Sequence, residues 1–220
     1  MAISDHYQGT AGRSDFAPVY WKQVRIEVFT LLRMGYERLP ASAFRDAEEP
    51  DITGELARVM NDITEDHNSP EWAWRYQVHD DPPVNLAGRF GKHRPRLDLR
   101  VDRTSRGPRP RYLFEAKRLN DGNQSAKKYL GKDGLGMFIA GTYGREVHEA
   151  GMLGYVQSGD IDQWVKKIAD QLEVDPRTTA PEGIWTAVPV VENLASYRSQ
   201  HPRTTLAEPI TIFHIFINFQ

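Results

Sequence analysis

Apolar residues recur at helical spacing in two segments near the start of the chain. The first helix is predicted over 19–39, where Pro40 ends the pattern. A second apolar stripe covers 51–63, with Asp51 or Thr53 as the expected N-cap. We expect the polar residues 1–17 to form a terminal arm and 41–50 to form a loop.

Three segments carry the pattern of β-strands. They cover 72–79, 96–102 and 111–117, and the second alternates strictly between polar and apolar residues. Side chains alternate between the two faces of a strand, so Glu115 and Lys117 are expected on one face. The segment 105–108 contains glycine and proline and is predicted to be the turn between the last two strands.

The C-terminal half is predicted to continue the alternation of helices and strands. We expect a polar and glycine-rich loop at 118–144, which should pack near Glu115 and Lys117, and a proline-containing loop at 173–183. Helices are predicted at 145–156 and 160–172, and strands at 184–191 and 211–219. This order predicts an α/β (α+β) fold with a mixed central sheet flanked by helices. The arm and helix in 1–50 are expected to pack as an N-terminal extension on a core formed by 51–220.

Composition narrows the class of protein. The 220 residues suffice for one sizeable core, and the absence of cysteine excludes disulfides and thiolate zinc sites. No signal peptide is readable, and the longest apolar stretch, 210–219, is too short for a membrane helix. We therefore expect a soluble, cytoplasmic protein with no membrane partner.

The formal net charge of −2 conceals a strongly basic segment. Between positions 92 and 118 there are ten Lys and Arg residues and three acidic residues, a local net charge of +7. Such an excess is expected where a protein contacts a phosphate backbone. The basic side chains expected to contact nucleic acid are Lys92, Arg96, Arg100 and Arg118.

Two carboxylates are expected to face each other across the second and third strands. If the hairpin closes symmetrically about its turn, Asp98 lies opposite Glu115, with Cβ atoms about 5 Å apart. Carboxylates at that distance repel unless a cation lies between them. Oxygen ligands favour Mg²⁺, or Mn²⁺, over zinc, and Lys117 on the same face could position the attacking water. Asp102 points the same way as Asp98 and remains the alternative metal ligand.

The spacing of these residues resembles a known signature. Asp98, sixteen further residues and then Glu115-Ala116-Lys117 is similar to the pattern of the PD-(D/E)XK nuclease superfamily, which includes restriction endonucleases. Leu97 stands where the first half of that pattern often has proline. The resemblance implies an αβββαβ core and Mg²⁺-dependent hydrolysis of DNA, or less often RNA. It further implies that Asp98, Glu115 and the Ala116 carbonyl hold the metal while Lys117 positions water.

The resemblance also suggests residues and partners beyond the central set. Glu55 matches a glutamate on the helix before the first strand, and Tyr155 and Gln157 match polar residues on the helix after the Glu-x-Lys strand. A role in restriction or phage defence would fit, with a homodimer, or a helicase, ATPase or sensor partner on another chain. The alternative is a nucleic-acid-binding or assembly subunit of the same fold that does not cleave.

Overall fold

The computed structural model describes residues 18–104, 109–120, 122–175, 177 and 185–220. The strands are β1 (Tyr76–Asp80), β2 (Leu99–Arg103), β3 (Arg111–Leu119), β4 (Glu149–Val156), β5 (Thr186–Ala187), β6 (Ser196–Arg203) and β7 (Leu206–Asn218). The α-helices are α1 (Pro18–Glu37), α2 (Glu49–Glu65), α3 (Gly122–Leu130), α4 (Leu135–Ile139) and α5 (Ile161–Glu173). Short 3₁₀ helices are η1 (Ala41–Phe44), η2 (Ala73–Arg75) and η3 (Gly91–His93).

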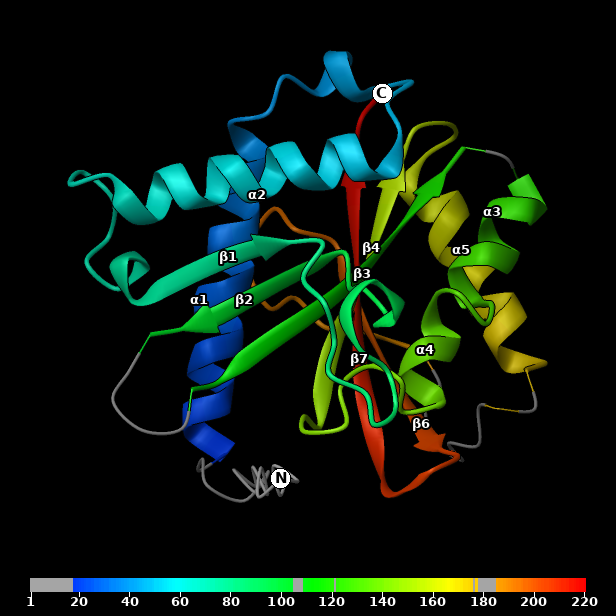
Figure 1. Ribbon diagram of the computed structural model, residues 1–220. Helices are drawn as coiled ribbons and strands as arrows, with labels where there is room; N and C mark the ends of the chain where they lie inside the picture. The colour runs from blue at the N-terminus through cyan, green and yellow to red at the C-terminus, as the bar shows by residue number, and fades with distance from the viewer. Residues whose placement is uncertain (1–17, 105–108, 121, 176, 178–184) are drawn as a thin grey trace, which may run out of the picture.

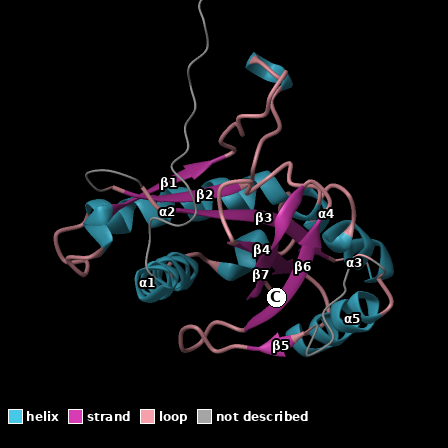
Figure 2. Ribbon diagram, turned by 90° about the horizontal axis from the view of Figure 1, so that it is seen from below, coloured by secondary structure: helices cyan, strands magenta, loops and turns pink. Residues whose placement is uncertain are grey.

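The strands form one seven-stranded mixed sheet in the order β1-β2-β3-β4-β7-β6-β5 (Figure 1). β4 pairs in parallel with β3 and β7, and the other pairings are antiparallel. Helix α1 covers one face, and α3 and α5 lie on the other (Figure 2). The expected mixed α/β architecture, with helices flanking the sheet, is therefore confirmed.

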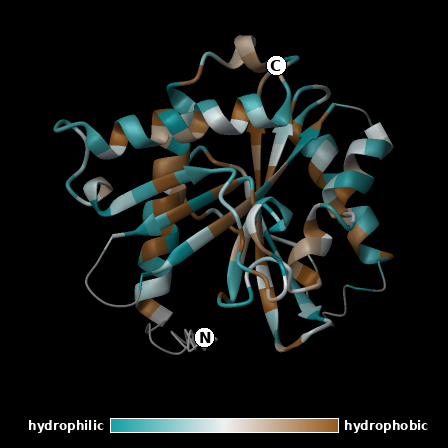
Figure 3. Cartoon of the chain, viewed as in Figure 1, coloured by the Kyte–Doolittle hydropathy of each residue, from teal (hydrophilic) through white to brown (hydrophobic). Residues whose placement is uncertain are grey.

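Aromatic contacts fasten both layers of helices to the sheet. On one face, the ring of Phe29 in α1 meets Tyr112 of β3 and Phe213 of β7 edge to face, at 5.5 and 5.6 Å between centroids. On the other, Tyr129 of α3 stacks on Phe216 of β7 at 6.3 Å. Hydrophobic residues run along the central strands (Figure 3). Because α1 contributes to the same buried cluster as the later elements, the N-terminal helix belongs to the one core.

Helix α2 begins earlier than the sequence pattern predicted. The expected cap at Asp51 or Thr53 is wrong, because Glu48 is the N-cap and Pro50 lies in the first turn. Proline is favoured there, since the first N–H groups of a helix have no partner within the helix. Thr53 is instead buried, where its hydroxyl donates to the Glu49 carbonyl at 2.9 Å. This early start places Glu49 on the helix.

The helix predicted over 145–156 is wrong, because this segment contains β4. All eight residues of β4 are buried between β3 and β7. A parallel strand covered on both faces is nearly continuously apolar, here from Ala150 onward, so its sequence lacks the period of two that identifies a half-exposed strand. Gly151 permits the close approach of β3, because a Cβ atom there would lie 2.2 Å from Cδ1 of Phe114.

Other segments also differ from the sequence pattern. The loop predicted over 118–144 contains α3 and α4, and the strand β6 was not predicted at all. Polar residues dominate α3, but Ala126, Tyr129 and Leu130 are buried, so tertiary packing rather than composition selects the helix. The first predicted strand is shorter than expected, since η2 occupies its beginning. The helix predicted at 160–172 is confirmed as α5, capped by the Asp160 side chain.

Several expectations concern segments outside the description. Two of them lie wholly outside the described residues, the terminal arm at 1–17 and the turn at 105–108. Most of the predicted loop at 173–183 lies outside them as well. Of the strand predicted at 184–191, the structure shows β5 alone. Within the part of the chain that is described, none of the helices combines the length and apolar character needed to cross a membrane.

The close packing of β3 on β4 can be tested with a matched pair of glycine substitutions. Gly151→Ala should lower the free energy of unfolding by about 1–3 kcal/mol, because the methyl group has no room against Phe114. Gly54→Ala, in the middle of α2 with its nearest neighbouring atom at 3.9 Å, should raise it by about 0.5–1 kcal/mol. Urea unfolding followed by circular dichroism measures both. Equal stability of Gly151→Ala and the wild type would contradict this packing.

Candidate active site

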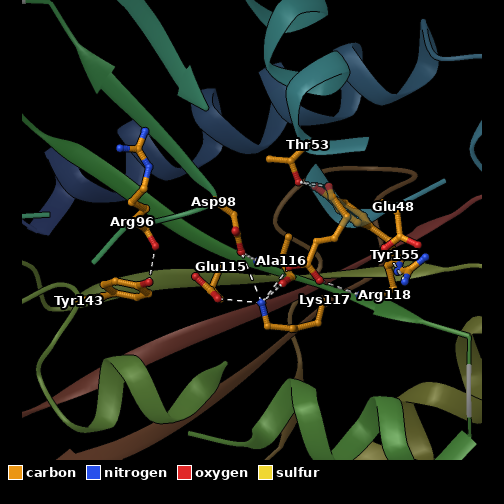
Figure 4. Close-up of polar contacts among 11 residues, drawn as sticks. Glu48, Thr53, Arg96, Asp98, Glu115, Ala116, Lys117, Arg118, Tyr143 and Tyr155 are labelled. Carbon is orange, nitrogen blue, oxygen red and sulfur yellow. Dashed lines mark hydrogen bonds and ion pairs between the residues drawn. The ribbon is translucent and has the colours of Figure 1, made fainter. Parts of the chain in front are cut away.

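The pairing of β2 with β3 determines which acidic residues meet. Leu99 lies opposite Phe114 and Asp102 opposite Arg111. Continuing this register by one residue brings Asp98 opposite Glu115, as the symmetric hairpin predicted. Asp98 Oδ2 accepts a hydrogen bond from the Ala116 N–H at 2.6 Å, which fixes the carboxylate at the start of β2 (Figure 4).

The Lys117 ammonium lies at the centre of the acidic residues. Its Nζ donates to Glu115 Oε1 at 2.8 Å and to Glu49 Oε1 at 3.1 Å, and lies 3.6 Å from Asp98 Oδ2. It also donates to the carbonyl oxygen of Ala116 (Figure 4). The structure thus brings Asp98, Glu115, the Ala116 carbonyl and Lys117 together.

The helix glutamate in this cluster is Glu49, and the expectation for Glu55 is corrected. Glu55 is partly exposed and pairs with Arg58 at 2.6 Å. Six residues along an α-helix amount to a rotation of about 240°, so Glu49 and Glu55 point in different directions. The sequence offered one clue to Glu49, because Pro50 favours a helix start at this point.

Burial and mutual repulsion perturb the titration of the cluster. Burial, and after it the nearby Asp98 carboxylate, raise the pKa of Glu115 to about 8. Burial also raises the pKa of Glu49. For Lys117, burial alone would lower the pKa, but Glu115, Asp98 and Glu49 together raise it above its usual value. Three carboxylates around one ammonium leave negative charge that a further cation would offset.

The oxygen atoms of this cluster fit a hard divalent cation. Glu115 Oε2 is buried and accepts no hydrogen bond from any residue that the structure describes. Together with Asp98 and the Ala116 carbonyl, it offers the few protein oxygens that Mg²⁺ needs, since Mg²⁺ completes its shell with water and substrate. No group of three or more His, Cys, Asp or Glu side chains arranged for metal binding occurs among the described residues, so such a site would depend on two carboxylates.

Asp102, the alternative ligand, lies elsewhere on the same face of the sheet. Its carboxylate is 3.0 Å from Arg100 Nε and 3.4 Å from His79 Nε2. It sits opposite Arg111, at the far end of β2 from Lys117. Asp98, directly before β2, is therefore the acidic residue that accompanies Glu115.

The basic residues do not form one continuous free patch. Three of the four expected phosphate contacts are in ion pairs: Arg96 with Asp81, Arg100 with Asp102, and Arg118 with Glu48, at 2.6, 3.0 and 2.7 Å. Arg103, also in the basic segment, is buried with its guanidinium 4.9 Å from the ring centroid of Tyr20. Lys92 is exposed on η3. Much of the local charge is therefore paired within the protein.

The expected roles of Tyr155 and Gln157 are also corrected. Tyr155 lies in β4 and Gln157 directly after it, rather than on a helix, and both side chains are buried. Tyr155 Oη lies 2.9 Å from Thr53 Oγ1 in α2, and Gln157 Nε2 donates to the carbonyls of Phe44 and Ala47 at 2.8 and 2.9 Å. These contacts join the end of β4 to α2, the helix that carries Glu49, and to the residues just before it.

Tyr143 is a site neighbour that the sequence pattern did not identify. Its hydroxyl donates to the carbonyl of Arg96, two residues before Asp98, and its ring packs edge to face on Phe138 at 5.7 Å (Figure 4). Burial raises its pKa, and the charges of Glu115 and Asp98 add to the shift. Tyr143 thus anchors the segment that leads into Asp98. It lies in the glycine-rich segment that was expected to pack near the site.

A second group of polar side chains is enclosed in the core. Ser199 Oγ lies 2.7 Å from His201 Nε2 and 2.7 Å from His214 Nε2, and His214 Nδ1 contacts Tyr129 Oη at 3.0 Å. The three residues of the serine–histidine group are at most 2% exposed. No substrate reaches them in this arrangement, so the candidate site is the cluster around Lys117.

Comparison of the chain with protein-family models, with curated proteins and with solved structures finds no match. Function is therefore inferred from the geometry and chemistry of this site.

The pKa of Glu115 predicts how cation binding should depend on pH. Below about 8 a proton competes for this carboxylate, so the apparent affinity for Mn²⁺ should rise with pH and level off above that value. The slope should approach a tenfold gain per pH unit where one proton is released. Isothermal titration calorimetry at several pH values measures it. A flat profile from pH 6 to 8 would contradict a role for Glu115 as ligand.

Proposed function

We propose that this protein is a Mg²⁺-dependent nuclease of the PD-(D/E)XK type that hydrolyses phosphodiester bonds, with DNA favoured over RNA. The observation that carries the proposal is the convergence of two carboxylates and a backbone carbonyl on one lysine ammonium. These groups come from β3 and from the residue directly before β2. The succession α2, β1, β2, β3, α3, with β4 following α4, supports the proposal because it follows the helix–strand order that the superfamily implies.

In this proposal, Asp98, Glu115 and the carbonyl of Ala116 would hold the cation. A bound divalent ion supplies positive charge to the phosphate and lowers the pKa of an attached water. Lys117 is kept protonated by its acidic neighbours, so its role is to orient the attacking water and offset charge on the phosphate, rather than to accept a proton. The water oxygen forms the new bond to phosphorus as the ester P–O bond breaks; the attacking water releases its proton to bulk water, and the leaving oxygen takes up a proton from bulk water.

Glu49 is a positioning residue in this scheme. Its Oε1 accepts from Lys117 Nζ, and its Oε2 accepts from the N–H of Arg118 at 3.3 Å. One carboxylate therefore links the first turn of α2 to two successive residues of β3. Carboxylates that orient catalytic groups in this way commonly contribute a 10–100-fold effect.

A non-cleaving nucleic-acid-binding or assembly subunit is the second candidate. It is favoured by the position of the Lys117 ammonium, which already partly neutralises the carboxylates without a metal ion. The two proposals separate cleanly, because binding that survives EDTA without any Mg²⁺-dependent product supports the second. A role in restriction or phage defence, alongside a partner or as a homodimer, remains part of the first proposal.

Substitution of the central residues tests the nuclease directly. Lys117→Ala and Glu115→Ala should each lower Mg²⁺-dependent cleavage of plasmid and single-stranded DNA by about 100-fold or more, because the first removes positive charge beside the reacting phosphate and the second removes a ligand of the cation. Gel assays with and without EDTA measure the products, and thermal unfolding checks that the variants fold. Normal cleavage by folded Lys117→Ala would refute the assignment.

Two of the glutamates of α2, Glu49 and Glu55, provide a matched pair. Glu49→Gln keeps the size of the side chain but removes the charge next to Lys117, so cleavage should fall by about tenfold. Glu55→Gln changes a pair with Arg58 on the exposed side of the helix, and cleavage should equal that of the wild type. Initial rates at saturating Mg²⁺ give the comparison. The reverse order of effects would restore Glu55 to the site.

A further inference from the structure

A long connection between β1 and β2 projects from the molecule. We call residues Val84–Pro95 the arm; from here on the word refers to this segment and not to the terminal residues 1–17. Its base is closed by the hydrogen bond from the Val84 N–H to the Pro95 carbonyl at 2.8 Å and by the isolated β-bridge between Pro83 and Arg96. In Figure 2 this segment rises from the ends of β1 and β2 and finishes in the short helix η3, which stands clear of the sheet. The arm is therefore built as an ordered projection.

Its composition differs sharply from that of the chain as a whole. From Val84 to Leu97 there is no acidic residue, while Arg89 and Lys92 are both exposed. Between them lies Phe90, whose side chain is 78% exposed. The side chains of Arg89 and Lys92 on the arm are thus exposed to solvent, whereas Arg100 of β2 and Arg118 of β3 are in ion pairs.

Tight turns and the 3₁₀ helix η3 form this tip. Gly88 and Gly91 flank Phe90 with φ angles of +77° and +54°, and no other residue comes within 4 Å of where their Cβ atoms would be. Arg94 ties the two sides of the arm together, because its Nη1 donates to Asn85 Oδ1 at 2.9 Å. The ring of Phe90 is therefore exposed on a loop whose two sides are joined by a hydrogen bond.

An exposed phenylalanine between two cationic side chains needs a physical reason. Burying such a ring is worth roughly 1.5–3 kcal/mol, which the isolated chain forgoes. Aromatic rings interleaved with basic residues are the arrangement that binds single-stranded nucleic acid, where bases stack on the ring and phosphates meet the cations. In a duplex every base face is already covered, so inserting a ring costs a few kcal/mol of unstacking.

The arm leads directly into the candidate site. Only two residues separate Pro95 from Asp98, a span of roughly 10 Å of extended chain. Between them, the carbonyl of Arg96 accepts the hydrogen bond from Tyr143 and so fixes where the arm leaves the body of the protein. The base of the arm therefore lies next to the segment that carries Asp98.

We propose that the arm binds the substrate strand beside the scissile phosphate, with Phe90 stacked on an unpaired base and Arg89 and Lys92 contacting the flanking phosphates. The substrate of the site is then single-stranded or locally unpaired DNA. This inference rests on the proposed nuclease function, whose substrate it narrows.

Binding in EDTA tests the arm without relying on catalysis. Fluorescence anisotropy with labelled oligothymidylate, and with a duplex of the same length, should show that Phe90→Ala weakens single-strand binding by about tenfold. Phe90→Trp should retain binding, with its added tryptophan fluorescence quenched on stacking. Arg89→Ala and Lys92→Ala should each reduce the slope of log affinity against log salt by about 0.7.

Matched controls come from exposed residues elsewhere. Trp74, 51% exposed outside the arm, and Lys166, exposed on α5, should give wild-type binding when changed to alanine. Equal binding by Phe90→Ala and the wild type, or no binding of oligothymidylate by the wild type, would overturn the arm proposal. An equal loss on duplex DNA would overturn the single-stranded substrate. Cleavage by the wild type in Mg²⁺ is scored separately, so a chain that binds through the arm but never cleaves would contradict the nuclease proposal alone.

Discussion

The register between β2 and β3 is the constraint on which the rest of the site depends. With Leu99 opposite Phe114, Asp98 faces Glu115 and Ala116 donates its N–H to the Asp98 carboxylate. A slip of one residue would turn the acidic side chains toward α1 and bury them among aromatic rings, so the apolar face of the hairpin enforces the pairing. The chemistry of the site is thus secured by hydrophobic residues that take no part in it.

Attraction between Lys117 and its acidic neighbours then joins parts of the chain that are distant in sequence. Glu49 reaches the ammonium from α2, while Arg118 and Gln157 hold the Ala47 carbonyl just before that helix. Burial makes these contacts consequential, because a charge withdrawn from water must be compensated locally. Burial and the neighbouring Asp98 carboxylate nevertheless raise the pKa of Glu115, and its second oxygen has no donor among the described residues, so a divalent cation suits the cluster.

The basic side chains near the site fall into two groups, one paired within the protein and one exposed on the arm. Arginines within β2 and at the end of β3 are used in ion pairs with Asp102 and Glu48, or are stacked on aromatic rings. The arm carries no acidic residue and keeps its cations exposed around Phe90. The cluster around Lys117 is compact, and the arm next to it is basic and carries an exposed aromatic ring. This arrangement suits the binding of a flexible polyanion.

The sequence by itself determined the hairpin, the shared face of Glu115 and Lys117, the helix α5 and the mixed α/β class, because these features follow from local periodicity and turn symmetry. It failed for β4, whose two buried faces erase the alternation that marks a strand, and for Glu55, whose selection over Glu49 depended on where α2 begins. Tyr155, Gln157 and the paired arginines acquired their roles only from tertiary contacts. Which polar groups are buried together, and which remain free for a ligand, is decided by packing between distant segments, and no local pattern encodes it.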